Sequence, residues 1–92
     1  MRFVYKKSYL KAFDKAEPGL RQLILKTDKE IKDHLEGGHS AYGLRVKKIG
    51  PRSYEARVSD KVRIVWVQEK DLVSFAMVGD HGEVQSYLKH FS

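Results

Sequence analysis

The second half of the sequence constrains the fold most, because short β-type segments follow one another there with very little chain between them. The segments are rich in Val, Ile and aromatic residues and span 44–49, 54–59, 62–68 and 72–78. Turn residues such as Gly50-Pro51 and Lys70-Asp71 lie in the links. Links this short force antiparallel neighbours, since a parallel crossover needs about a dozen residues. The sequence therefore predicts a four-stranded antiparallel sheet.

The first half predicts one strand followed by two helices. Residues 2–5 form an apolar and aromatic run that suits a strand, and Ser8 can cap the helix that follows. Pro18 suits the first turn of a second helix, which we expect to end at Gly37-Gly38. Apolar residues of this helix recur at helical spacing and predict one buried stripe: Leu20, Leu23, Ile24, Ile31 and Leu35.

The end of the chain predicts a short helix over 83–91, because Val84, Leu88 and Phe91 then share one face. The order of strand, two helices, four strands and helix is that of an α+β domain. We expect a single domain over residues 1–92, in which the N-terminal strand and the helical hairpin pack on the antiparallel sheet.

Composition limits the classes of function. The 92 residues include no Cys, which excludes disulfides, thiolate zinc ligands and a thiol nucleophile. The chain has no apolar signal core and no segment long enough to span a membrane, so we expect a cytoplasmic protein without a membrane partner. A net charge of +6, from 18 Lys and Arg against 12 Asp and Glu, indicates an anionic partner, either nucleic acid or an acidic protein.

Most of this charge lies in one quarter of the chain. Residues 43–64 contain seven Lys and Arg against two acidic residues. Side chains alternate between faces along a strand, so the face opposite the apolar sets carries Arg45, Lys47 and Arg57. Neighbouring strands lie about 5 Å apart, so these cations can converge on one phosphate. The alternative is a solvated face on which Glu55 pairs with one of them.

Two further residues near this face have two interpretations each. Arg63 either joins the basic face or is a structural arginine that pairs with Asp60 or Glu55. His39 lies in a Gly-rich loop that precedes the basic strand, where it contacts RNA or simply faces solvent.

His81 is the candidate for proton transfer. It follows the last predicted strand, where a His can act as general acid or base near neutral pH, or serve only as a turn or capping residue. Tyr87 has the spacing more typical of a core or rim residue, and the alternative is a base-stacking contact to RNA. No carboxylate cluster suits a two-metal nuclease, no phosphate-binding loop is present, and the His spacing does not suit zinc. We therefore expect no metal and no cofactor.

Four segments, in order, resemble the RelE/ParE superfamily of toxin–antitoxin toxins. They are 43–49 (Gly-Leu-Arg-Val-Lys-Lys-Ile), 54–58 (Tyr-Glu-Ala-Arg-Val), 62–66 (Val-Arg-Ile-Val-Trp) and 78–84 (Val-Gly-Asp-His-Gly-Glu-Val). Members often show a basic strand, a "YRLRV" strand, a "YRVIY" strand and a terminal "VGHREEVY" segment. The likeness covers about half of the chain directly, and the helical hairpin agrees in kind. It implies a RelE-like toxin fold.

The RelE-like branch of this superfamily is a ribosome-dependent endoribonuclease (an mRNA interferase) that cuts mRNA in the decoding site and so inhibits translation. By resemblance, a ribose 2′-OH would attack the adjacent phosphate without a metal, which requires a base, stabilising cations and an acid. Lys47 and Arg57 match the family's basic positions and would stabilise the phosphate and the transition state. His81 stands where many members carry Arg and YafQ-like members carry His, and it would be the general acid or base.

The same resemblance gives Arg45 and Lys48 an RNA-binding role, in which they would hold the mRNA backbone or ribosomal RNA. From their charge and position in the sequence, we add three further candidates for RNA binding: Arg52, Arg63 and His39. Two departures from the family pattern are Glu55, at the first Arg of the "YRLRV" strand, and Gln85, at the usual terminal Tyr.

Two other functions fit the resemblance. A ParE-like toxin would bind and inhibit DNA gyrase without cleaving anything, and a degenerate toxin would only bind nucleic acid or a protein partner. In each case we expect a cognate antitoxin with an acidic, amphipathic segment that covers the basic face.

Overall fold

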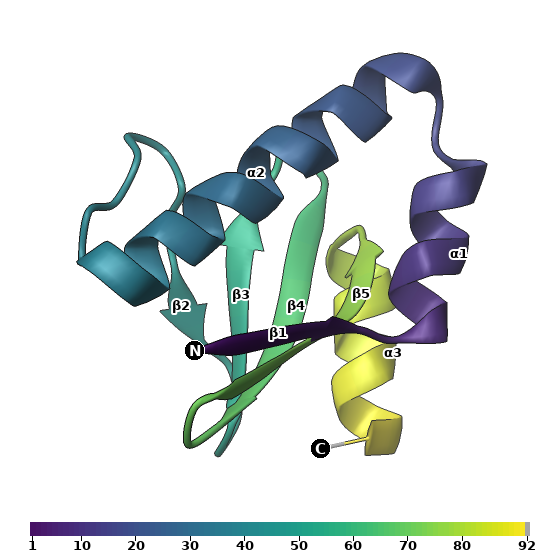
Figure 1. Ribbon diagram of the computed structural model, residues 1–92. Helices are drawn as coiled ribbons and strands as arrows, with labels where there is room; N and C mark the ends of the chain where they lie inside the picture. The colour runs from purple at the N-terminus through teal and green to yellow at the C-terminus, as the bar shows by residue number, and fades with distance from the viewer. Residues whose placement is uncertain (92) are drawn as a thin grey trace.

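The computed structural model of the chain describes residues 1–91, and the side chain of the last of these lies outside the description. In chain order the elements are β1 (Arg2–Tyr5), α1 (Lys7–Lys15), α2 (Pro18–Gly37), β2 (Lys47–Lys48), β3 (Ser53–Arg57), β4 (Arg63–Glu69), β5 (Leu72–Gly79) and α3 (His81–Phe91). The predicted order of strand, two helices, four strands and helix is confirmed (Figure 1). Phe91, expected on the same face of α3 as Val84 and Leu88, falls outside the described side chains.

The sheet has five strands in the order β1-β5-β4-β3-β2. Strands β2 to β5 form the predicted antiparallel meander. β1 adds a fifth strand, parallel to β5, with Arg2 opposite Leu72 and Tyr5 opposite Phe75. The sheet is therefore mixed rather than purely antiparallel. The short-link argument did not apply to β1, because most of the chain separates it from β5.

One face of the sheet packs on α1 and α2. Tyr9 of α1, and Ile24 and Ile31 of α2, form one buried cluster with the inward side chains of the strands, among them Trp66 and Phe75. Trp66 is fully buried. Figure 1 shows α2 running diagonally across the sheet, with α1 beside β5. This layer holds the larger hydrophobic core.

The other face of the sheet packs on α3. Val84 of α3 forms a second buried cluster with Val65 and Met77, and Tyr87 and Leu88 pack at its edge. The helix was expected, but its position was not: it covers part of the sheet face that the sequence analysis took as open.

Ser8 does not cap α1, contrary to expectation. The N-cap residue is Lys6 and carries no side-chain cap. The pairing of β4 with β5 is irregular between Val65 and Trp66, which leaves Ala76 without a partner in the ladder. The Ser8 hydroxyl donates to the carbonyl of Ala76. The Ser8 hydroxyl, which the sequence predicted as a helix cap, therefore binds the Ala76 carbonyl that the β-bulge leaves unpaired.

The helical stripe on α2 is narrower than predicted. Ile24 and Ile31 are buried, and Leu20 and Leu35 are partly buried against the core. Leu23 is exposed instead, because residues 24 and 31 fix the centre of the buried face and Leu23 lies at its edge. Gly38 ends the helix in the left-handed conformation, with φ of 70°.

The first predicted strand of the second half is much shorter than 44–49. Only Lys47–Lys48 pair with β3. Gly43 has φ of 85° and Arg45 has φ of 49°, so the backbone turns twice in the left-handed region before the strand begins. Leu44 between them is buried in the main core, and this anchors the irregular segment.

Candidate nucleic-acid interface

Strand register places four charged residues on the α3 side of the sheet. Lys47 lies directly opposite Glu55, and Arg57 lies directly opposite Arg63. Directly opposed residues share a face, as do residues two apart on one strand. Lys47, Glu55, Arg57 and Arg63 therefore form one surface, the basic face. The predicted placement of Lys47 and Arg57 on a common face agrees with this register.

Arg57 and Arg63 form a cross-strand pair of like charges, the arginine pair. Like charges directly opposite one another destabilise a sheet unless they are compensated. The Arg57 guanidinium pairs with Asp60 in the turn after β3, and its side chain is 28% exposed. Compensation from an exposed carboxylate leaves this cation accessible to an anion from solution.

Arg63 has the structural role that the sequence left open. Its Nη1 donates to the carbonyl of Ser59 at 2.6 Å and to the carbonyl of Asp60 at 3.3 Å, and its Nε lies 3.8 Å from a carboxylate oxygen of Glu55. These contacts close the β3–β4 turn. Asp60 contributes only its carbonyl to Arg63, since its carboxylate pairs with Arg57.

His81 begins α3 directly beyond the arginine pair. Gly79, two residues earlier, lies opposite Arg63 in the sheet. The helix start is fixed by a capping box: Asp80 Oδ1 accepts from the N–H of Glu83 at 2.8 Å, and Glu83 Oε1 accepts from the N–H of Asp80 at 2.9 Å. The His81 side chain is exposed and makes no hydrogen bond or ion pair with another residue in 1–91. Its imidazole is therefore not committed to the fold.

The other residues predicted to contact RNA do not lie on the basic face. Lys48 follows Lys47 on the strand and so belongs to the opposite side of β2. Arg45 lies outside the strand in the irregular segment, and His39 lies in the exposed loop after α2. Arg52 lies at the opposite end of β3 from Arg57, where it pairs with Glu69 at 3.0 Å. The basic face itself contains Lys47, Arg57 and Arg63 from the predicted set.

Tyr42 was not singled out from the sequence, yet it is fully exposed beside Arg57. The turn that carries it closes with a hydrogen bond from the N–H of Leu44 to the carbonyl of Ala41 at 3.2 Å. The carbonyl of Leu44 then accepts from the N–H of Arg57 at 2.8 Å. Tyr42 and Arg57 line one small hollow of about 110 Å³ between the turn, α2 and the end of β3. Gly43 indicated a turn at this place, but no pattern in the sequence indicated that Tyr42 would be exposed beside Arg57.

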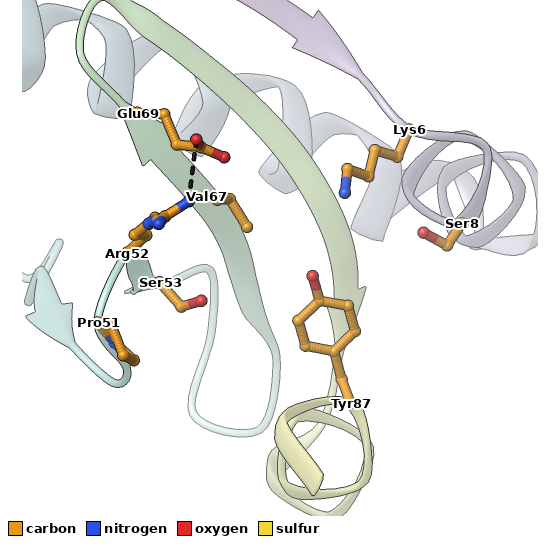
Figure 2. A pocket seen from close by; sticks show the side chains of 8 residues that line it. All are labelled: Lys6, Ser8, Pro51, Arg52, Ser53, Val67, Glu69 and Tyr87. Atoms are coloured by element: carbon orange, nitrogen blue, oxygen red, sulfur yellow. Dashed lines mark hydrogen bonds and ion pairs between the residues drawn. The ribbon is translucent and has the colours of Figure 1, made fainter. Parts of the chain in front are cut away.

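A second, larger hollow lies on the side of α3 away from the arginine pair. It is a cleft of about 590 Å³, formed where segments distant in sequence meet (Figure 2). Its lining residues are Lys6, Ser8, Pro51, Arg52, Ser53, Val67, Glu69 and Tyr87. Burial raises the pKa of the Tyr87 hydroxyl, so this group stays protonated at neutral pH. Tyr87 packs at the edge of the smaller core, as expected of a rim residue.

Within residues 1–91 no three His, Asp or Glu side chains gather into a group that could hold a metal ion. No helix in the same range is long and apolar enough to cross a membrane.

Comparison with solved structures identifies the fold. A chain of the RelB–RelE antitoxin–toxin complex from Methanococcus jannaschii superposes with a TM-score of 0.65 at 19% identity, over 91% of this chain and 96% of that chain. YafQ from E. coli superposes with a TM-score of 0.66 at 13% identity, over 91% of this chain and 98% of that chain. A chain of the YoeB dimer from Staphylococcus aureus superposes with a TM-score of 0.68 at 12% identity, over 88% of this chain and 97% of that chain. The chain therefore has the RelE-like toxin fold, as the sequence resemblance predicted.

No family model and no curated protein matches the sequence. At identities this low, the likeness establishes the arrangement of helices and strands, and the chemistry has to be argued from the residues of this chain.

Proposed function

We propose that this protein is the toxin of a toxin–antitoxin pair and that it cleaves mRNA in the ribosomal decoding site. The observation that carries the proposal is the basic face, where Lys47 and Arg57 project from neighbouring strands and His81 begins the helix beyond them. The fold supports it, because solved structures with this fold include RelE, YafQ and YoeB toxins. A cognate antitoxin is proposed on the same grounds, since two of these solved structures are RelB–RelE and DinJ–YafQ complexes.

The proposed reaction is attack of a ribose 2′-OH on the adjacent phosphorus, with departure of the 5′-oxygen. The phosphate gains negative charge as the fifth oxygen bonds to phosphorus, and fixed cations stabilise that charge most when they are already in place. Arg57 has this property, because Asp60 holds its guanidinium while a quarter of the side chain stays exposed. Lys47 adds a second positive charge on the same face.

Proton transfer is assigned to His81. The 2′-OH must lose a proton and the leaving 5′-oxygen must gain one, and an imidazole performs either step near neutral pH. His81 is exposed at the start of α3. Arg45, Lys48 and His39 are proposed as contacts to the mRNA backbone or ribosomal RNA on either side of the reacting nucleotide. Arg63, which closes the β3–β4 turn, would contribute to RNA binding through its charge.

A second candidate function is ParE-like inhibition of DNA gyrase without cleavage. The specific observation that favours it is internal neutralisation: Arg57 and Arg63 are both paired with carboxylates of the same chain. Cations that are already neutralised within the chain attract a polyanion less strongly, and the mixed charges can pair with complementary charges of a protein partner.

Translation-coupled cleavage of a defined mRNA with purified ribosomes tests the proposal. We compare the wild type with Arg57→Ala and His81→Ala, and with Arg2→Ala as a control that removes an arginine from the opposite edge of the sheet. We expect cleavage only when ribosomes are present. Loss of one transition-state cation or of the proton-transfer group should each slow it by about 10²- to 10³-fold, and Arg2→Ala should cut at the wild-type rate.

An intact mRNA in the presence of translating ribosomes would contradict the proposal. If the same preparation blocked DNA supercoiling by gyrase, the second candidate function would replace it. Circular dichroism of each variant shows whether lost activity reflects lost folding.

A further inference from the structure

We propose that the cleft on the far side of α3 is a second RNA subsite that binds one nucleotide by its phosphate and its base. The inference deepens the proposed function and rests on it, since it extends the RNA path beyond the arginine pair. The cleft volume of about 590 Å³ lies within the range of sites that hold molecules of this size.

Three segments bring hydrogen-bond donors and positive charge to this cleft. Lys6 lies at the start of α1, Arg52 in the β2–β3 turn and Tyr87 on α3. In Figure 2 the Lys6 ammonium and the Tyr87 hydroxyl point into the same space, with Arg52 across from them. Lys6 makes no ion pair with any residue of 1–91, and this leaves its charge available to an anion.

The N-terminus of α1 adds to this positive potential. The first turn of the helix has no side-chain cap and no acidic residue. The amide N–H groups at a helix start carry partial positive charge and bind phosphates. Lys6 and Ser8, which flank this start, are both among the lining residues. The cleft thus combines the positive charge of Lys6 with the dipole at the N-terminus of α1.

Ser53 adds a hydroxyl group to the wall of the cleft. The residue is only 6% exposed, and its hydroxyl makes no hydrogen bond within residues 1–91. Figure 2 shows this hydroxyl directed into the cleft. A hydroxyl in this position can donate to a phosphate oxygen or pair with a base.

The walls of the cleft favour a nucleotide over an acidic peptide. The ring of Tyr87, with Val67 and Pro51, offers apolar surface on which a base can rest. The Glu69 carboxylate stands at the cleft with one oxygen on Arg52; its remaining lone pairs can accept from a base amino group. The same carboxylate would repel the carboxylates of an acidic peptide.

This subsite is separate from the arginine pair. Ser53 and Arg57 lie four residues apart on β3, which corresponds to roughly 13 Å along the strand. One phosphate group cannot contact both places, so they hold different nucleotides of one strand. α3 lies on the sheet between the two, and Val84 contacts the sheet there.

Two-dimensional NMR of the ¹⁵N-labelled full chain tests the inference. The probes are a single-stranded 2′-O-methyl RNA hexanucleotide, which cannot be cleaved, adenosine 5′-monophosphate, inorganic phosphate and a Glu-rich peptide. We expect the hexanucleotide to shift the amide signals of residues 6–9 and 52–54 as well as those of Arg57 and Arg63. Adenosine 5′-monophosphate should shift the first set at lower concentration than inorganic phosphate does.

Lys6→Ala and Lys7→Ala are the matched variants, because both remove one exposed lysine from adjacent positions and only Lys6 lines the cleft. Lys6→Ala should weaken hexanucleotide binding by about five-fold and reduce the slope of log affinity against log salt by about 0.7. Lys7→Ala should change the affinity by less than about two-fold. Ser53→Ala should weaken binding of adenosine 5′-monophosphate without lowering the slope of log affinity against log salt.

The outcomes separate this inference from the proposed function. Shifts at Arg57 and Arg63 alone would overturn the subsite and leave the proposed function intact. Shifts at the cleft alone would support the subsite and remove the RNA contact that the proposed function needs. Equal effects of phosphate and monophosphate, or a response to the Glu-rich peptide and not to RNA, would overturn the nucleotide assignment.

Discussion

Tyr9 illustrates how a single side chain can be well packed and still carry a cost. It is 3% exposed, and its ring contacts those of Tyr5 and Phe75 with centroids 5.2 and 5.7 Å away. Its hydroxyl is buried and has no hydrogen-bond partner within residues 1–91. Burial, with the negative charge of Asp28 nearby, raises the pKa of Tyr9 above its ordinary value of 10.0.

Tyr9→Phe should therefore stabilise the protein, by about 1 kcal/mol at neutral pH, because it removes a buried polar group and keeps the ring. It should also reduce alkaline destabilisation. A pKa raised in the folded state means that the unfolded chain loses its proton first, so stability is complete below pH 10 and falls above it. Urea unfolding at pH 7 and at pH 10.5 measures both effects.

The matched control is Tyr42→Phe, which removes a hydroxyl that faces solvent and should change stability by less than about 0.5 kcal/mol. A clear loss of stability in Tyr9→Phe would contradict the expectation, since it would mean that the hydroxyl gains a partner in solution.

At the scale of elements, the position of α3 depends on one glycine. A Cβ placed on Gly79 would lie 2.9 Å from Cβ of Glu83 and 2.9 Å from Cε of Met77. The Met77 methyl group can move aside, but Cβ of Glu83 is fixed to the first turn of α3, so a larger residue at position 79 requires this turn to shift. This close approach of β5 and α3 positions the capping box and His81 beside the arginine pair.

Gly79→Ala should destabilise the protein by about 1–3 kcal/mol, the usual cost of overpacking a well-packed contact. We expect α3 to shift on the sheet, with changes in the NMR signals of Val65 and Val84 and a lower denaturation midpoint in urea.

Gly82→Ala is the control for this substitution, since its nearest contact would be Asp80 Oδ1 at 3.5 Å. Within a helix this change should stabilise by up to about 1 kcal/mol. If both alanines behaved alike, the close approach at Gly79 would not be what holds α3 in place.

At the scale of the whole molecule, a polar network joins the edge strand β1 to α2. The Tyr5 hydroxyl donates to Asp28 Oδ2 at 2.6 Å, and Lys32 Nζ donates to the Tyr5 oxygen at 2.7 Å. Lys32 Nζ also lies 3.3 Å from the other carboxylate oxygen and 5.4 Å from the Phe3 ring centroid. Burial acts to lower the pKa of Lys32, but the Tyr5 hydrogen bond and the Asp28 charge outweigh it, so the pKa is raised.

Asp28→Asn should cost about 1–3 kcal/mol, because it leaves partly buried Lys32 without its counter-charge. Asp33→Asn is the matched control: it breaks the exposed pair with Lys29, also four residues apart on α2, and should cost less than about 0.5 kcal/mol. Thermal unfolding compares the two variants. Hydrogen exchange of the β1 amides should quicken only in Asp28→Asn, and equal exchange in both variants would contradict a role for the network in holding β1.

Local pattern predicted the parts of the fold that depend on local forces. The antiparallel meander followed from strand period and short links, and the start of α2 at Pro18 and its end at Gly38 followed from residue conformation. Lys47 and Arg57 were placed on one face because alternation and hairpin register are local properties. The same reasoning overextended the strand at 44–46, since the buried position of Leu44 depends on the core and not on the period.

Only the tertiary structure decided how distant segments meet. β1 pairs with β5 across most of the chain, α3 lies on the face expected to be open, and Arg63 binds the β3–β4 turn rather than projecting freely. The cleft that Lys6, Ser53 and Tyr87 share has no signal in the sequence, because its walls come from four segments that no local pattern connects. Sequence by itself therefore determined the elements and the sign of the charge they carry. Long-range packing determined which charges remain accessible and which segments form the cleft.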